Sequence, residues 1–233
     1  MTSPTPEQLA ELARWDTPSL SNALDSLRLR PFETGYSDGS VSRITGSTTP
    51  APRVMVGVAV TAKMVAREPG DNGVPVAQLH AKIVEMANTI GPVVVVLEDL
   101  DVPAGAGAFL GEVNGSLLDA LGIAGIVTNG RVRDVNELRR FNYPVYASGL
   151  CVARAHMRLV EVGTPVCVAG LAVETGDILH GDEHGVLHVP MDALPAIFRK
   201  AELIREDEQR IVEWSRSPDF SIDALLALRR VRH

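Results

Sequence analysis

The chain has 233 residues, of which 45% are hydrophobic, and a formal net charge of −7. A chain of this size can bury one sizeable core, and its acidic balance argues against nonspecific nucleic-acid binding, which needs a basic surface. No apolar run approaches the roughly 18 residues of a membrane span, and the polar N-terminus lacks the features of a targeting peptide, so we expect a cytoplasmic protein.

The first half of the chain alternates between helical and strand-like patterns. Apolar residues at helical spacing predict helices over 6–15, 17–29 and 78–90. Strands are predicted over 54–65 and 92–97, and the continuous apolar run of the second is typical of a strand covered on both faces. A loop rich in glycine, serine, threonine and proline fills 31–52.

The second half continues the alternation and ends in a charged helical segment. Helices are predicted over 114–121, 134–141, 191–214 and 222–228. Strands are predicted over 123–127, 144–148, 151–154 and 166–173, at 178, and over 186–189. Cys151 and Cys167 lie in apolar surroundings, which favours buried free thiols. The patterns predict a mixed α/β domain over 1–190 and a helical extension over 191–233 that packs on the same or a neighbouring subunit.

A glycine-rich loop, residues 105–111, follows the predicted strand 92–97. Its spacing is G-x-G-x-x-x-G and no helix opens at once, so it is a weak dinucleotide signature. Glycines of this kind also let backbone N–H groups approach a ligand carboxylate closely.

Arg133 and Asp134 come just beyond the predicted strand 123–127. Ligands of open α/β sheets bind at such strand ends. Two readings of Asp134 stay open: it caps the next helix in a capping box with Glu137, or it is a hard-oxygen ligand for Mg²⁺ or Mn²⁺. Arg133 has the planar charge that clamps a carboxylate.

Three histidines recur every four residues at His180, His184 and His188. On a helix they would align as zinc ligands. Glycines interrupt the run, however, and a β-hairpin with an Asp-Glu-His-Gly turn fits the pattern better.

The motifs of residues 111–134 resemble the RraA-like superfamily. The resemblance is carried by Gly111-Glu112, by the run 122–127, and by Asn129-Gly-Arg-Val-Arg-Asp134, and it extends from about Asp16 to Pro190. An acidic residue followed by twenty others and then Arg-Asp marks the branch of divalent-metal 4-hydroxy-4-methyl-2-oxoglutarate and 4-carboxy-4-hydroxy-2-oxoadipate aldolases. The family more often has aspartate where this chain has Glu112.

The resemblance implies a swivelling β/β/α sandwich that assembles as a homotrimer or homohexamer with active sites between subunits. It also implies that Asp134 holds Mg²⁺ or Mn²⁺ while Arg133 neutralises the enolate of a keto-acid substrate. Glu112 would act through water as general base and acid. Gly111 and the amides of Val113 and Asn114 would bind the substrate carboxylate.

The implied reaction is cleavage of a 4-hydroxy-2-oxo acid to pyruvate and an oxo-acid, with oxaloacetate decarboxylation as a side activity. A Schiff-base aldolase would instead need a lysine, and Lys63, Lys82 and Lys200 lie outside any glycine-rich pocket motif. Other RraA-like proteins bind and inhibit the endoribonuclease RNase E, so a non-catalytic regulator is the alternative. Another hydroxy-acid substrate is a third possibility.

Overall fold

The computed structural model describes residues 3–45 and 53–231, so part of the predicted loop 31–52 lies outside the described residues. The strands are β1 (Ser42–Arg43), β2 (Met55–Val65), β3 (Val93–Asp99), β4 (Gly125–Thr128), β5 (Val145–Ala147), β6 (Arg158–Val162), β7 (Val166–Val168), β8 (Leu171–Val173), β9 (Ile178–Asp182) and β10 (Gly185–Val189). The helices are α1 (Pro6–Leu12), α2 (Thr17–Leu27), α3 (Val76–Thr89), α4 (Glu112–Ala120), α5 (Val135–Leu138), α6 (Leu194–Ser215) and α7 (Ile222–Val231), with a 3₁₀ turn at Met191–Ala193.

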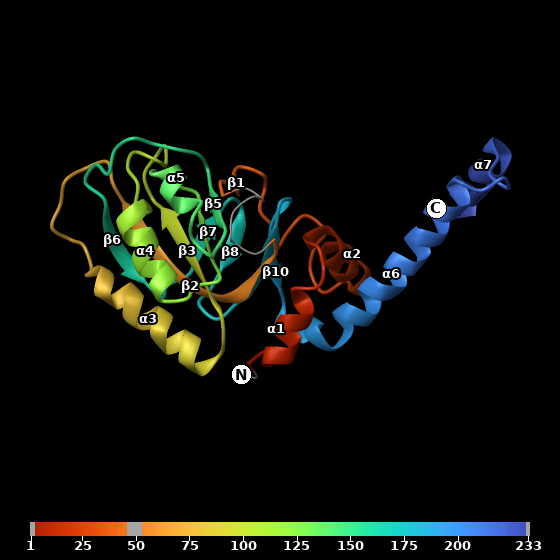
Figure 1. Ribbon diagram of the computed structural model, residues 1–233, viewed down its shortest axis with the longest axis horizontal. Coiled ribbons are helices and arrows are strands. Elements are labelled where there is room, and N and C mark those ends of the chain that lie inside the picture. Colours follow the sequence, from red (N-terminus) through yellow and green to blue (C-terminus); the bar gives the residue numbers. More distant parts are fainter. Residues whose placement is uncertain (1–2, 46–52, 232–233) are drawn as a thin grey trace.

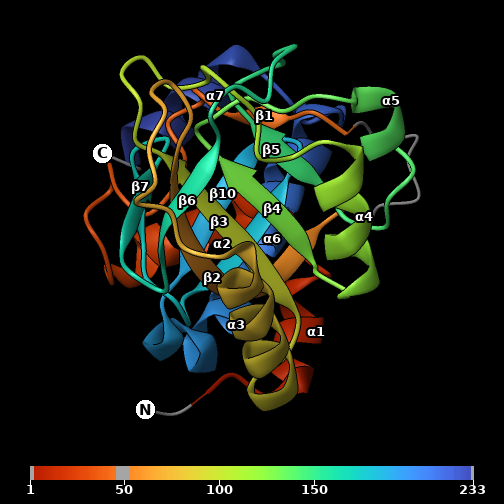
Figure 2. The same ribbon diagram turned by 90° about the vertical axis from the view of Figure 1, so that its left-hand side faces the viewer.

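A mixed sheet in the order β1-β5-β4-β3-β2-β9-β10 forms the centre, and β6 pairs with β2 outside this path. Strands β2, β3, β4 and β5 are parallel to one another, so their carboxyl ends share one edge. Helices α3 and α4 cover one face of the sheet (Figure 1, Figure 2). The small antiparallel β7–β8 hairpin covers the other face.

Strand β3 shows why these layers follow from the sequence. Val93, Val95 and Leu97 belong to the cluster packed under the helices. Val94 and Val96 belong to the cluster under the β7–β8 hairpin. Because side chains alternate between faces along a strand, a strand covered on both sides must be apolar throughout. The predicted β/β/α sandwich is confirmed.

A third core joins the two ends of the chain. Helices α1 and α2 pack against β9, β10 and the first turns of α6, around buried Leu20, Leu24, Leu187 and Ile197. Beyond this contact α6 and α7 leave the body as an arm (Figure 1). The arm agrees with the predicted C-terminal helices, whereas the division of the chain at residue 190 stays a prediction.

Two predicted elements in the second half are wrong. The helix expected over 134–141 is only the single turn Val135–Leu138, because the Asn142 N–H donates to Asp119 at 2.9 Å and the chain turns toward β5. Residues 151–154 form no strand, since the Ala153 carbonyl accepts from Ala108 N in the glycine-rich loop.

The region 166–173 is a hairpin rather than one strand. Ala169 and Gly170 adopt φ values of 53° and 73°, which turns the chain between β7 and β8. Cys167 is exposed on β7 because alternate residues of that short strand face outward. Cys151 is half-buried, so the prediction of two buried thiols is wrong. No described helix combines the length and hydropathy that a membrane-spanning segment requires.

Candidate active site

The glycine-rich loop after β3 is held by the buried carboxylate of Asp99. This side chain accepts hydrogen bonds from Gly105 N at 2.6 Å and Asp101 N at 3.0 Å. Asn129, just after β4, exchanges two hydrogen bonds with the Asp99 backbone, at 2.7 and 2.9 Å. Burial raises the pKa of Asp99. The ends of two parallel strands are therefore tied together, and the loop leaves them in a fixed direction.

Arg133 and Asp134 meet the far end of this loop at Gly111. The Arg133 N–H donates to the carbonyl of Leu110 at 3.1 Å, which aligns the two segments. A Cβ on Gly111 would lie 2.5 Å from Asp134 Oδ2 and 3.0 Å from Arg133 Nε. The absence of a side chain at Gly111 therefore lets both side chains approach closely, whereas its φ of −149° suits any residue.

Asp134 does not form the predicted capping box. It precedes α5 with φ 55° and ψ 45°, in the left-handed region, and its side chain makes no cap hydrogen bond. The carboxylate Oδ2 instead accepts from Glu112 N at 2.9 Å and lies 3.5 Å from Arg133 Nε. A left-handed conformation in a non-glycine residue is unfavourable, and this contact between the start of α4 and the segment after β4 offsets it.

Helix α4 directs its N-terminus toward the same place. Gly111 is its N-cap, and the N–H groups of its first turn have no acceptor within the helix. The amides of Val113 and Asn114 belong to this turn, where the helix dipole favours an anion. The Asn114 side chain is already engaged, because its Nδ2 donates to the carbonyl of Phe109 at 2.7 Å.

A cavity of about 340 Å³ opens beside these groups. Four predicted binding residues line it, namely Gly111, Val113, Asn114 and Arg133. Its other lining residues are Val76, Ala108, Phe109, Arg154 and Met157. The lining therefore combines two guanidinium groups with an apolar wall and contains no acid.

The predicted site residues do not all enter the cavity. Asp134 and Glu112 are exposed and lie next to it, joined to each other through the backbone of Glu112. Sequence reasoning missed Arg154, Phe109 and Met157. The only sequence signal for Arg154 is a charged side chain in a segment of small residues, and the sequence pattern predicts a strand there.

The family resemblance implies a divalent metal, and Asp134 can supply part of its coordination. Oδ2 is engaged, whereas Oδ1 receives no hydrogen bond from any residue in the described ranges. Mg²⁺ is commonly held by one or two carboxylates and completes its shell with water and substrate. The residues present fit such a sparse site.

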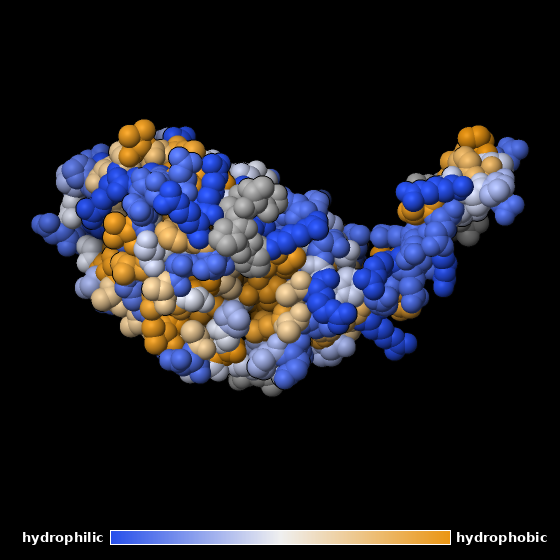
Figure 3. All heavy atoms as spheres, viewed as in Figure 1, coloured by the Kyte–Doolittle hydropathy of each residue, from blue (hydrophilic) through white to orange (hydrophobic). Residues whose placement is uncertain are grey.

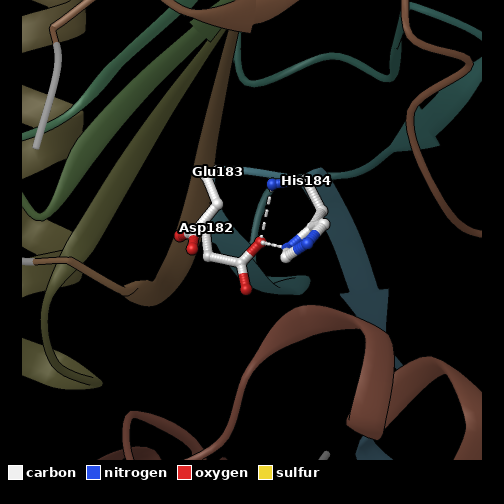
Figure 4. A group of neighbouring side chains, drawn as sticks. All are labelled: Asp182, Glu183 and His184. Carbon is white, nitrogen blue, oxygen red and sulfur yellow. Dashed lines mark hydrogen bonds and ion pairs between the residues drawn. The ribbon is translucent and has the colours of Figure 1, made fainter.

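A second group of possible metal ligands lies in the β9–β10 hairpin. The ligand atoms of Asp182, Glu183 and His184 fall within 4.8 Å of one another (Figure 4). Asp182 already accepts from Thr17 N at 2.8 Å and from His184 N at 2.9 Å, and Glu183 pairs with Arg53 at 2.9 Å. Burial alone would raise the pKa of Asp182, but these hydrogen bonds outweigh it and the pKa is lowered. The group is the turn of a hairpin, as the sequence predicts.

His180 confirms the hairpin reading of the three histidines. Its Nε2 lies 3.2 Å from the Leu12 carbonyl and 3.1 Å from the Trp15 carbonyl, and its Nδ1 lies 3.0 Å from Thr17 Oγ1. Carbonyls only accept, so Nε2 carries the proton and Nδ1 accepts from the Thr17 hydroxyl. The ring thereby links the turn between α1 and α2 to β9, and both of its nitrogens are hydrogen-bonded.

The fold and the cavity define an α/β protein with a small arginine-lined site at the carboxyl ends of its parallel strands. The profile of the RraA-like family, described as Aldolase/RraA, matches residues 17–188, and the chain belongs to this family.

Similar sequences include an uncharacterized protein and proteins whose names describe them as putative aldolases. An uncharacterized protein of Methanocaldococcus jannaschii is 38% identical over 93 residues, which are 40% of this chain and 45% of that protein. A protein of Xanthomonas campestris named "Putative 4-hydroxy-4-methyl-2-oxoglutarate aldolase" is 34% identical over 113 residues, 46% of this chain and 65% of that protein. A Halalkalibacterium halodurans protein of the same name is 26% identical over 103 residues, 44% of this chain and 49% of that protein. Each match spans less than two thirds of the relative's own length.

Solved structures show the same fold. An uncharacterized protein from Pseudomonas syringae has a TM-score of 0.70 at 24% identity, covering 93% of this chain and 96% of that one. Streptomyces coelicolor RraAS2, described as an unusual member of the RNase ES inhibitor RraA protein family, has a TM-score of 0.69 at 20% identity, covering 93% of this chain and 98% of that one.

Proposed function

We propose that the protein is a divalent-metal-dependent aldolase that cleaves a 4-hydroxy-2-oxo dicarboxylic or tricarboxylic acid to pyruvate and a second oxo-acid. The observation that carries this proposal is the convergence of Arg133 and Asp134 on Gly111, beside a cavity and the start of α4. This arrangement offers a cation, a hard anionic oxygen and free backbone donors within one small volume. The names of the Xanthomonas and Halalkalibacterium relatives support the same class of reaction.

The reaction breaks the bond between C3 and C4 of the substrate. The C4 hydroxyl loses its proton and becomes a carbonyl, while the bonding electrons pass to C3 and form the enolate of pyruvate. Arg133 lies in the cavity lining, where its fixed charge stabilises the enolate oxygen as it develops. The amides of Val113 and Asn114 hold the substrate carboxylate at the helix start.

Glu112 is proposed as the group that moves the proton. Its side chain is exposed at the first position of α4, so water can stand between its carboxylate and the substrate. It would take the C4 hydroxyl proton through that water and return a proton to C3. Asp134 would hold Mg²⁺ or Mn²⁺, which when bound supplies Lewis-acid polarisation of the substrate oxygens.

Oxaloacetate decarboxylation follows from the same site. Loss of its C4 carboxylate as CO₂ leaves the electron pair on C3, which is again the enolate of pyruvate. Arg133 would stabilise the same oxygen in both reactions, so an aldolase of this kind should release pyruvate from oxaloacetate.

We further propose that the working form is a homotrimer or homohexamer. The arm exposes a run of apolar side chains that its own body leaves uncovered, and Figure 3 shows apolar surface at its tip. These residues are Leu203, Val212, Phe220, Ile222 and Leu226. Short helices in water need packing against another surface, and a neighbouring subunit would provide it.

The test is a coupled pyruvate assay on the purified protein. It compares 4-hydroxy-4-methyl-2-oxoglutarate, 4-carboxy-4-hydroxy-2-oxoadipate and oxaloacetate, each with added Mg²⁺. The proposal predicts metal-stimulated pyruvate release from oxaloacetate and from at least one hydroxy-oxo acid. Absence of pyruvate from every substrate, together with inhibition of purified RNase E, would replace it with the regulator.

A further inference from the structure

The cavity contains one charged side chain that the proposed reaction does not use, that of Arg154. It comes from residues 151–156, a segment separate from both the glycine-rich loop and the start of α4. Within the described ranges its guanidinium makes no ion pair, and no acid lines the cavity. Arg133, in contrast, is accompanied by Asp134 at 3.5 Å. Arg154 is therefore a positive charge in the cavity lining to which the proposed reaction assigns no partner.

The backbone that carries Arg154 is fixed by the glycine-rich loop. The Ala153 carbonyl accepts from Ala108 N at 3.0 Å, and His156 N donates to the carbonyl of Ala66 at 3.0 Å. Gly107 packs directly on the Arg154 carbonyl group, and a Cβ there would lie 2.8 Å from the carbonyl carbon. The segment that bears Arg154 is thus held on one side by the glycine-rich loop and on the other by the residue that follows β2, although it contains no regular secondary structure.

The rest of the cavity wall indicates what else a ligand would contact. Val76, Phe109 and Met157 give this wall an apolar surface. Such a surface suits a short hydrocarbon segment. A volume of about 340 Å³ lies at the lower end of the range of small-molecule sites and is enough for a small acid.

We infer that Arg154 is a specificity-determining residue that binds the second carboxylate of the substrate. The oxo-acid end lies with Arg133 and the helix start, and the distal carboxylate lies with Arg154, because a guanidinium is the side chain best matched to a carboxylate. This inference rests on the proposed function for the identity of the oxo-acid end. It adds the side chain by which the site selects these dicarboxylates over monocarboxylates.

Binding of two matched ligands tests this inference without requiring turnover. The ligands are 2-oxoglutarate and 2-oxopentanoate, which share five carbons and an oxo-acid end and differ only in a terminal carboxylate or methyl group. Calorimetry in the presence of Mg²⁺ compares the wild type with Arg154→Gln, Arg154→Lys and the control Arg140→Gln. Arg140 is exposed and is not part of the cavity lining, so its loss removes the same charge elsewhere.

The wild type should prefer 2-oxoglutarate by about 10- to 100-fold, the range expected for a charge-assisted pair. Arg154→Gln should abolish this preference by weakening 2-oxoglutarate alone, Arg154→Lys should keep part of it, and Arg140→Gln should keep all of it. Equal weakening of both ligands by Arg154→Gln, or an unchanged preference, would overturn the assignment.

The two proposals fail in different ways. If the protein releases no pyruvate but shows the Arg154-dependent preference, the aldolase proposal is wrong and the role of Arg154 stands. If the protein releases pyruvate and Arg154→Gln discriminates the two ligands as well as the wild type does, the aldolase proposal stands and the role of Arg154 is wrong.

Discussion

The carboxylate of Asp134 accepts a hydrogen bond from the backbone N–H of Glu112 at 2.9 Å, across 22 positions of sequence. This contact joins the first residue of α4 to the segment that follows β4. It brings the acidic residue and the Arg-Asp pair of the motif to one place, and it leaves Oδ1 of Asp134 available for a cation. The proposed chemistry depends on this relationship.

Asp134→Asn separates the roles of shape and charge at this position. The amide oxygen of asparagine can still accept from Glu112 N, whereas the hard anionic ligand is lost. We expect pyruvate release to fall more than about 100-fold, since changes even outside the ligand set of a metal site commonly cost 10- to 100-fold. Steady-state kinetics with varied Mg²⁺ measures this effect. The exposed Asp192→Asn is the control, and equal activity of the two variants would remove Asp134 from the site.

Arg133→Lys keeps the charge and loses the planar fork. If Arg133 stabilises the enolate, kcat for oxaloacetate should fall about 10²- to 10³-fold, the usual loss for one group aimed at a developing oxyanion. The KM should change much less, because the interaction strengthens in the transition state. A variant whose KM alone rises would show that Arg133 merely binds substrate.

Gly111→Ala tests the close approach at the centre of the site. The added Cβ would lie 2.5 Å from Asp134 Oδ2, so the carboxylate must move, while the backbone φ of −149° tolerates alanine. We expect kcat/KM to fall about 10- to 100-fold with little change in Tm, because small misplacements of reacting groups have large kinetic effects.

Gly163→Ala is the matched control for that experiment. Gly163 has φ of +82° and open space around it, so alanine should lower Tm through backbone strain and leave kcat/KM unchanged. Should Gly111→Ala lower Tm and leave kinetics intact, the contact at Gly111 would be structural only.

His180 gives a pH dependence of stability. Burial lowers the pKa of His180 below its ordinary value of about 6.5. Asp182 and the nearby carbonyls raise this pKa, but they offset only part of the shift. The unfolded chain therefore binds a proton at a pH where the native chain does not, so stability falls as the pH drops below about 6.5. We expect Tm to decrease between pH 7 and pH 5.5, and to decrease less in His180→Gln. Ring ¹⁵N shifts that showed a charged His180 at pH 6 in the folded protein would contradict this account.

The sequence predicts the layers and the centre of the site better than it predicts the connections. The apolar run of β3 and the helical spacing of α3 are local patterns, and they are enough to place both elements. The sequence does not predict β6, because only one of its five residues is fully buried and its pattern is weak. The strand forms by pairing with β2, which is distant in the sequence.

Asp134 shows why site geometry escapes sequence reasoning. The residues Asp134 to Glu137 satisfy the capping-box pattern, but the carboxylate binds the N–H of Glu112 instead, and that partner lies in another helix. The sequence does not predict the role of Arg154 for a similar reason. The position of Arg154 depends on contacts with the glycine-rich loop and not on its own segment. In both cases the deciding contact is between segments far apart in the chain.

The most direct test of the central claim is the effect of a chelator on pyruvate release from 4-hydroxy-4-methyl-2-oxoglutarate. The account predicts that EDTA abolishes activity of the wild type, that Mg²⁺ or Mn²⁺ added in excess restores it, and that Asp134→Asn is inactive under both conditions. Full activity of the chelated wild type, or of Asp134→Asn, would contradict it.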